Sequence, residues 1–151
     1  MRTQSKLCFE LAQDSDYTTL CEMHHAAYRD VVKKQFGRWD TQEQDWFFEQ
    51  SWQRNAHQLI LWREKLCGYC CVIEHGDALE LAEIVLSPIH QGFGLGSRVL
   101  EHLMKQAELR SVPLKLQVLR QSRAVSFYER LGFQRDGESA NHIKMCFRPN
   151  S

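Results

Sequence analysis

The chain has 151 residues, of which 43% are hydrophobic and 25% charged, as in a globular protein long enough to bury a core. Its 19 basic and 19 acidic residues cancel, which argues against nucleic acid as the main partner. No apolar run approaches the roughly 20 residues of a membrane span, and the polar start lacks the apolar core of a signal peptide. We therefore expect one domain over residues 1–151, no membrane partner and a cytoplasmic location.

The first forty residues predict a strand followed by a helix. Residues 7–11 alternate as a strand, and Asp14 and Asp16 offer an N-cap for a helix that runs to about Tyr28. The inner face of this helix is expected to carry Leu20, Met23, His24 and Ala27. Residues 29–40 mix basic and aromatic side chains around a glycine, so they predict a loop or a broken helix.

A second helix and three antiparallel strands follow. Thr41 is the expected cap of the helix over residues 41–53, and its aromatic residues are available for burial: Trp46, Phe47 and Trp52. Residues 58–63 and 66–74 predict a hairpin, and a turn at 75–77 leads into a third strand over residues 79–86. That strand is apolar apart from two carboxylates, and it ends at Ser87-Pro88 because proline cannot donate to a ladder.

Three glycines on alternate positions, Gly92, Gly94 and Gly96, separate this strand from an amphipathic helix that runs to Arg110. A strand, a glycine turn and a helix N-terminus together form an anion site, because exposed N–H groups and the helix dipole favour negative charge. The spacing fits neither the nucleoside triphosphate loop nor the dinucleotide turn. We expect a phosphorylated ligand of another kind.

The rest of the chain predicts a strand, a helix and two closing strands. Pro113 breaks the long helix, residues 114–119 alternate as a strand, and Ser122 can cap a helix over residues 123–131. Gly132 stands where a left-handed C-terminal cap belongs. Residues 133–136 and 141–148 then form two short strands.

A C-x-x-C motif lies in the hairpin, at Cys67 and Cys70. Residues three apart on a strand project from opposite faces, so these thiols are not expected to share a metal or a disulfide. No second pair stands at zinc-ribbon spacing. We expect buried thiols in a reducing compartment and no metal site, with redox or metal chemistry left as the alternative.

Two motifs resemble the GNAT superfamily of N-acetyltransferases. Gln91, Gly94 and Gly96 stand on the defining positions of its Q/R-x-x-G-x-G/A motif. Residues 120–133 are similar to its second hallmark, with matches at Ala124, Phe127, Tyr128, Leu131, Gly132 and Phe133. One position departs from the pattern, because Gln121 or Ser122 replaces the usual asparagine.

The resemblance implies an α/β (α+β) GNAT fold, in which about six or seven mostly antiparallel strands are flanked by about four helices. The fourth and fifth strands would be parallel and splayed, with acetyl-CoA as co-substrate between them. The residues implied to contact acetyl-CoA are Ile84, Val85, Leu86, Gln91, Gly92, Phe93, Gly94, Leu95, Gly96, Ser97, Ser122 and Ala124.

The implied reaction is direct attack of a primary amine of a small molecule or peptide on the thioester in a ternary complex. The backbone amide near Leu86 would polarise the carbonyl, and Tyr128 would donate a proton to the departing sulfur. An amine of pKa about 10.4 is mostly protonated at neutral pH, so a base or a desolvating pocket must remove a proton. Glu83 is the candidate, because it interrupts an apolar strand where desolvation should raise its pKa.

The acceptor is expected between the first two helices, along residues 24–46. Basic and aromatic side chains there suggest an amine that also carries an anionic or aromatic group, although a solvated basic loop is the plainer interpretation. A catalytically silent module of the same fold, which binds acyl-CoA or another protein, is the alternative function. A homodimer is a further open alternative.

Overall fold

The computed structural model describes residues 6–92 and 94–150, and within them the chain forms a seven-stranded sheet in the order β1-β2-β3-β4-β5-β7-β6. The strands are β1 (Leu7–Leu11), β2 (Gln58–Trp62), β3 (Lys65–His75), β4 (Ala78–Leu86), β5 (Leu114–Leu119), β6 (Gln134–Glu138) and β7 (His142–Phe147). The helices are α1 (Tyr17–Phe36), α2 (Thr41–Arg54), α3 (Leu95–Arg110) and α4 (Ala124–Leu131). Neighbouring strands are antiparallel except for the parallel pair β4 and β5, so the expected fold class is confirmed.

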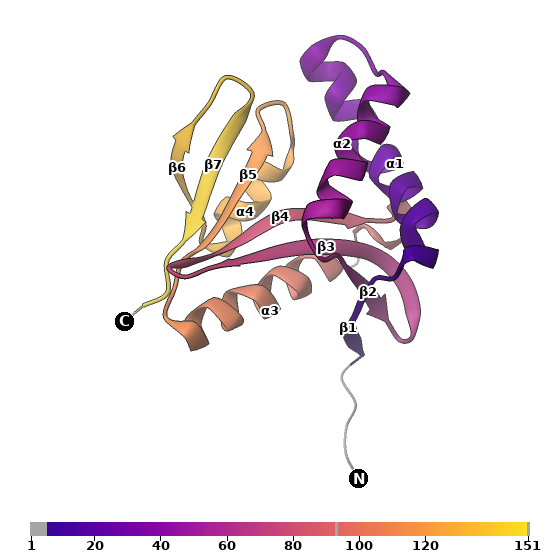
Figure 1. Ribbon diagram of the computed structural model, residues 1–151. Coiled ribbons are helices and arrows are strands. Elements are labelled where there is room, and N and C mark those ends of the chain that lie inside the picture. The colour runs from indigo at the N-terminus through magenta and orange to yellow at the C-terminus, as the bar shows by residue number, and fades with distance from the viewer. Residues whose placement is uncertain (1–5, 93, 151) are drawn as a thin grey trace.

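Two apolar cores lie on opposite sides of the sheet. The first packs α3 and α4 against the sheet, with Val99, Leu100 and Leu114 fully buried. The second packs α1 and α2 against β3 and β4 through Leu20 and Phe48. Figure 1 shows this arrangement, with α1 and α2 on one side of β3 and β4 and α3 on the other.

The parallel strands β4 and β5 pair over a short length and then separate. Their register joins Leu79 to Leu114 and ends where Leu81 meets Leu116. From there β5 stays with β7, while β4 stays with β3 as far as Leu86. The upper part of Figure 1 shows β5, β7 and β6 diverging from β3 and β4. The remainder of β4 therefore borders an opening in the sheet.

A β-bulge at Ala82 lies where this separation begins. Cys71 of β3 pairs with Glu83 and the next residue, Val72, pairs with Leu81, so Ala82 is the extra residue. Leu81 belongs to the core under α3, as strand alternation from Leu79 requires. Beyond the bulge the alternation is inverted, and Val85 belongs to the core under α1 and α2. The bulge therefore turns Glu83 toward α1 and α2.

Helix α1 is longer than predicted. The expectation of a loop or broken helix over residues 29–40 is wrong, because the helix continues to Phe36 and ends at Gly37, whose φ of 81° is left-handed. Lys33 and Lys34 lie in the last turn, where positive charge suits the helix dipole. The cap of α2 is also corrected: Asp40, not Thr41, accepts a hydrogen bond from the Glu43 N–H at 3.1 Å.

The predicted burial of two aromatic residues on α2 is also wrong. Trp46 and Phe47 are 58% and 47% exposed, whereas the neighbouring Phe48 is 1% exposed. Trp52, one turn after Phe48, packs against the same core, as expected. Residues four apart share a helix face, so the Phe48 and Trp52 pair defines the inner side and leaves Trp46 and Phe47 outside.

Gly68 should be the glycine least able to accept a side chain. It pairs with Leu86, and a Cβ built on it would lie 2.0 Å from the carbonyl oxygen of Val85. We expect Gly68→Ala to lower the free energy of unfolding by at least about 2 kcal/mol, because backbone must move to relieve the overlap. Chemical denaturation measures this.

The matched control is Gly76→Ala, because a Cβ on Gly76 has no heavy-atom neighbour within 4 Å and its φ is not left-handed. A Gly68→Ala variant as stable as Gly76→Ala would contradict the close approach of β3 to β4.

Candidate functional site

The edge of β4 that borders the opening carries backbone hydrogen-bonding groups. The Ser87 N–H donates to the carbonyl of Cys67 at 2.8 Å, which is toward β3. Successive N–H groups of a strand point to opposite sides, so those of Leu86 and Ile84 point toward the opening. The Leu79 N–H, before the bulge, points in the same direction and donates to the carbonyl of Pro113 at 2.9 Å. The strand end can therefore pair with an extended ligand that carries amide groups.

Gln91 ties the end of β4 to the glycine turn. Its side-chain amide donates to the carbonyl of Leu86 at 3.0 Å. This contact leaves the Leu86 N–H unaffected and fixes where the turn leaves the strand.

The glycine turn leads directly into the N-terminus of α3. Gly92 and Gly94 have left-handed φ values of 85° and 77°, which explains why glycine is needed at both. Gly94 is the N-cap and supplies no side-chain acceptor, so the N–H groups of Leu95, Gly96 and Ser97 remain available, as in other anion sites. Phe93, which was expected to contact the cofactor, lies outside the described residues.

Gly96 brings the start of α3 close to its neighbours. A Cβ at this position would lie 3.4 Å from the ring of Phe127 and 3.7 Å from the side chain of Leu86. The glycine therefore holds the helix N-terminus next to the end of β4 and next to α4.

His90, just before the turn, has an unsatisfied side chain. Among the described residues, its Nδ1 is the buried side-chain nitrogen or oxygen without a hydrogen-bond partner. A buried polar atom without a partner costs free energy, which a polar ligand can recover.

Ser122 and Ala124 form the start of α4, which follows the end of β5. The helix begins at Ala124, and the Ser122 hydroxyl accepts a hydrogen bond from the Ala124 N–H at 3.1 Å. The Ser122 N–H donates to the carbonyl of Leu119 at 2.9 Å. The predicted cap is therefore corrected: the helix starts one residue later than expected, its N-cap is Arg123, and Ser122 precedes the N-cap.

Glu83 lies in a nearly closed, mostly apolar environment. Its side chain is 16% exposed, and its Oε1 accepts a short hydrogen bond from the Tyr69 hydroxyl. Burial raises the pKa of Glu83 from 4.5 to about 7, and the hydrogen bond from Tyr69 opposes that rise. Near neutral pH this carboxyl can therefore both lose and accept a proton.

His24 and Tyr28, one helical turn apart on α1, face the same region. The His24 Nε2 lies 3.9 Å from the Glu83 Oε2, and the His24 and Tyr28 ring centres are 4.7 Å apart. Burial, and then His25, lower the pKa of His24 to about 4, so it is neutral at pH 7. Burial raises the pKa of Tyr28 well above 10, and the nearby Glu83 and Tyr128 add to that rise.

The sequence placed both residues within the expected acceptor segment, residues 24–46, and His24 on the inner face of its helix, but it did not place either beside Glu83. The signal that could have found them is their helical spacing of four residues, which puts a histidine and a tyrosine on one face.

Tyr128 is buried on α4. It is 6% exposed, its ring lies 5.2 Å from that of Phe127 and 5.6 Å from that of Phe133, and burial raises its pKa to about 12. A phenol with this pKa stays protonated at neutral pH and can donate a proton. Tyr28, whose pKa Glu83 raises, also has its pKa raised by Tyr128, so both groups lie within electrostatic range of Tyr28.

Part of the expected acceptor segment is engaged in contacts of its own. The Arg29 guanidinium lies 5.2 Å from the Trp39 ring centre, and Arg38 lies 3.5 Å from carboxylate oxygens of Asp40 and Glu43. These exposed pairs order the α1–α2 connection.

Comparisons with known proteins bear on these features. A family model described as acetyltransferase (GNAT) domain matches residues 54–135, more than half of the chain. This match includes β4, the glycine turn, α3 and α4. No curated protein matches the sequence.

Several solved structures share the fold at low sequence identity. The PaiA N-acetyltransferase from Thermoplasma acidophilum, in complex with coenzyme A, is 15% identical with a TM-score of 0.75, covering 95% of this chain and 99% of that one. A GNAT family acetyltransferase from Elizabethkingia anophelis with acetyl-CoA bound is 12% identical with a TM-score of 0.67, covering 96% and 99%. The ribosomal-protein-S18-alanine N-acetyltransferase from Escherichia coli is 20% identical with a TM-score of 0.63, covering 96% and 95%.

Among the described residues, no helix combines the length and the apolar character that crossing a bilayer requires.

The burial of Glu83 should make stability depend on pH in a way that Glu83→Gln removes. Because its pKa is raised from 4.5 to about 7, its contribution to stability is fully present below pH 4.5 and is lost as the pH rises through 7. Glutamine has no charge to bury, so relative to the parent the variant should gain stability from about pH 5 upward, by up to roughly 3 kcal/mol near pH 9. Urea denaturation across this range measures the difference.

Glu101→Gln, which removes an exposed carboxyl on α3, is the matched control and should show no such gain. A Glu83→Gln difference that stays constant with pH would mean that the carboxyl is solvated.

Proposed function

This chain belongs to the GNAT family of acetyltransferases, and from that premise we propose that it transfers the acetyl group of acetyl-CoA to a primary amine of a small molecule or peptide. The observation that carries the proposal is Glu83, a carboxyl of pKa about 7 beside the opening between β4 and β5. Acetyl transfer to an amine needs a base of this strength near the thioester.

The backbone around the opening supports binding of acetyl-CoA. The amides at the start of α3 would receive the diphosphate, and the edge of β4 at Ile84 and Leu86 would pair with the amide groups of the pantetheine arm. Arg98, in the first turns of α3, stacks on the Trp62 ring with its guanidinium 5.1 Å from the ring centre, so it is held by that ring. Phosphate binding would therefore depend mainly on backbone amides and the helix dipole.

Three groups would share the chemistry. Glu83 would take a proton from the ammonium form of the acceptor, directly or through a water, so that the amine nitrogen can attack the thioester carbon. The Leu86 N–H would hydrogen-bond to the carbonyl oxygen as its negative charge develops. As the carbon–sulfur bond breaks, Tyr128 would donate its proton to the thiolate, and its raised pKa keeps that proton in place until then. The attacking nitrogen would lose its extra proton through water to the tyrosinate, which leaves a neutral amide, free coenzyme A and the phenol of Tyr128.

The region of α1 that faces Glu83 supports an acceptor site there. His24 is neutral and Tyr28 is uncharged, so together with Tyr69 they surround the carboxyl with weakly polar aromatic groups. Such surroundings favour the uncharged form of an amine, because they solvate an ammonium ion poorly.

We expect Gly94→Ala to weaken acetyl-CoA binding by roughly tenfold, because displacing the helix amides loses about one charge-assisted hydrogen bond. Isothermal titration calorimetry measures this. Gly37→Ala is the matched control: both glycines are left-handed, at 77° and 81°, and a Cβ on either has no heavy-atom neighbour within 4 Å, so the backbone strain is comparable. Equal affinities of the two variants would count against the glycine turn as the diphosphate site.

Glu83→Gln and Tyr128→Phe should affect turnover in different ways. If Glu83 is the base, kcat/KM of the parent rises with pH through about 7, and Glu83→Gln loses this rise together with about 10²–10⁴-fold in rate. Tyr128→Phe should also lower kcat, by about 10²-fold or more, yet keep the rise near pH 7 and the affinity for acetyl-CoA. Release of free coenzyme A across a panel of amines measures both.

Tyr17→Phe is a control for Tyr128→Phe, because Tyr17 bonds to Glu49 away from the opening. Tight binding of acetyl-CoA without turnover on any amine, and without an effect of Tyr128→Phe, would support the catalytically silent module instead.

A further inference from the structure

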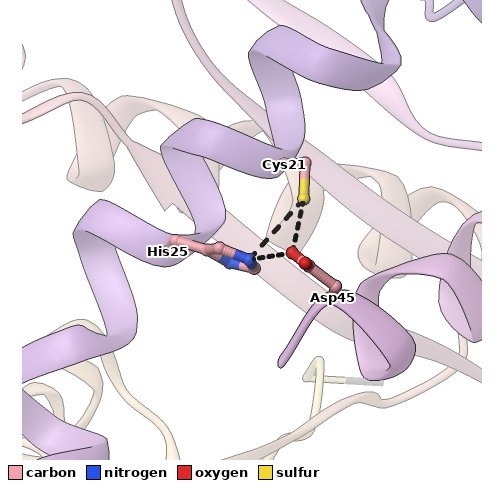
Figure 2. Close-up of side chains that lie close together, drawn as sticks. All are labelled: Cys21, His25 and Asp45. Carbon is pink, nitrogen blue, oxygen red and sulfur yellow. Dashed lines mark hydrogen bonds and ion pairs between the residues drawn. The ribbon is translucent and has the colours of Figure 1, made fainter. Parts of the chain in front are cut away.

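Three potential metal ligands converge between α1 and α2. Cys21 and His25 lie one turn apart on α1, and Asp45 reaches them from α2, as Figure 2 shows. The Cys21 Sγ lies 3.7 Å from the His25 Nε2 and 3.8 Å from the Asp45 Oδ1, and the His25 Nε2 lies 2.6 Å from the Asp45 Oδ1. The three donor atoms therefore surround one point in space.

We propose that Cys21, His25 and Asp45 bind a divalent ion of the zinc class. Tetrahedral zinc with sulfur, nitrogen and oxygen ligands at about 2.0–2.3 Å places those ligand atoms roughly 3.3–3.6 Å apart. The two distances from Cys21 are already within a few tenths of an ångström of this range. Only the contact between His25 and Asp45 has to lengthen, as their hydrogen bond is replaced by two bonds to the ion.

The identity of the donors favours zinc over magnesium or calcium. A thiolate and an imidazole suit zinc and its neighbours in the transition series, whereas magnesium and calcium prefer oxygen ligands. Three protein ligands leave a fourth position for water or another molecule. The Asp45 side chain is 55% exposed, so an ion can enter from solvent, while the His25 side chain is only 12% exposed.

The arrangement does not fit a nucleophilic cysteine. In a Cys-His-Asp relay the thiol and the carboxylate contact opposite ring nitrogens of the histidine. Here both contact the Nε2 of His25, and its Nδ1 contacts the Nδ1 of His24 at 2.9 Å.

The contact with His24 completes the surroundings of the proposed ion. Metal-bound histidines usually donate their second ring N–H to a neighbouring acceptor, which fixes the ring. The His24 Nδ1 is in position to accept from the His25 Nδ1–H. Since His24 also lies 3.9 Å from Glu83, the proposed metal site is next to the region where the acceptor amine is expected.

A titration with Co²⁺ tests the proposal on the full chain, without any assay of acetyl transfer. Tetrahedral Co²⁺ bound to a thiolate gives an ultraviolet charge-transfer band and intense visible bands, which Zn²⁺ should then abolish by displacement. We expect stoichiometric binding in the parent. Loss of a residue that only hydrogen-bonds to a metal ligand typically weakens metal binding by roughly 10–100-fold. Cys21→Ser and Asp45→Asn should each weaken Co²⁺ binding by more than that, because each removes a ligand.

Cys8→Ser and Asp30→Asn are the matched controls, because both residues are exposed and lie outside the cluster. These two variants should bind Co²⁺ like the parent. Circular dichroism and thermal melting without metal test whether each variant is folded. If Cys21→Ser does not fold, the Co²⁺ affinity of Asp45→Asn, a change at an exposed position, tests the proposal by itself. Unchanged Co²⁺ binding in both ligand variants, or the absence of a thiolate band in the parent, would overturn the proposal and leave a hydrogen-bonded contact between the helices. Neither result would affect the proposed acetyl transfer.

Discussion

The bulge at Ala82, where β4 leaves β5, is the constraint on which the rest of the site depends. Before Ala82 in the chain, β4 is an interior strand whose alternate residues pack under α3. After Ala82, the extra residue reverses which side chains face each side of the sheet, so that Glu83 and Val85 turn toward α1 and α2 and the backbone edge borders an opening. One inserted residue thus produces both the backbone edge suited to a ligand and the placement of the carboxyl beside that edge.

The two halves of the proposed site handle charge differently. At the start of α3, negative charge would be received by backbone amides made accessible by Gly92 and Gly94, while Arg98 is held on the Trp62 ring. At Glu83, burial among tyrosines and a neutral histidine makes ionisation costly, which brings the pKa into the neutral range. Both effects arise from how the backbone is folded and solvated rather than from pairs of opposite charges.

Local patterns in the sequence predicted most strands and helices along the chain, including the glycine turn and α3, because glycine conformations and helical periodicity are local properties. The end of α1 and the inner face of α2 were predicted wrongly, since a run such as Trp46 to Phe48 offers several apolar faces and only packing against Tyr69 and Leu20 selects one. The bulge depends on register with β3, which no single segment contains. The spacing of Cys21 and His25 is visible in the sequence, but Asp45 comes to them only through the pairing of two helices.

The short junction between β4 and β5 also has a mechanical meaning. Among the described residues, the short ladder from Leu79 to Leu81 with Leu114 to Leu116 is the strand pairing that joins β1 to β4 with β5, β7 and β6. Farther along, Leu86 of β4 and Phe127 of α4 both lie next to Gly96 of α3, where no ladder joins β4 to β5. An extended ligand with amide groups could pair with the free edge of β4 as an added strand between β4 and β5. Binding of such a ligand would then also restrict the motion of these two parts of the sheet relative to each other.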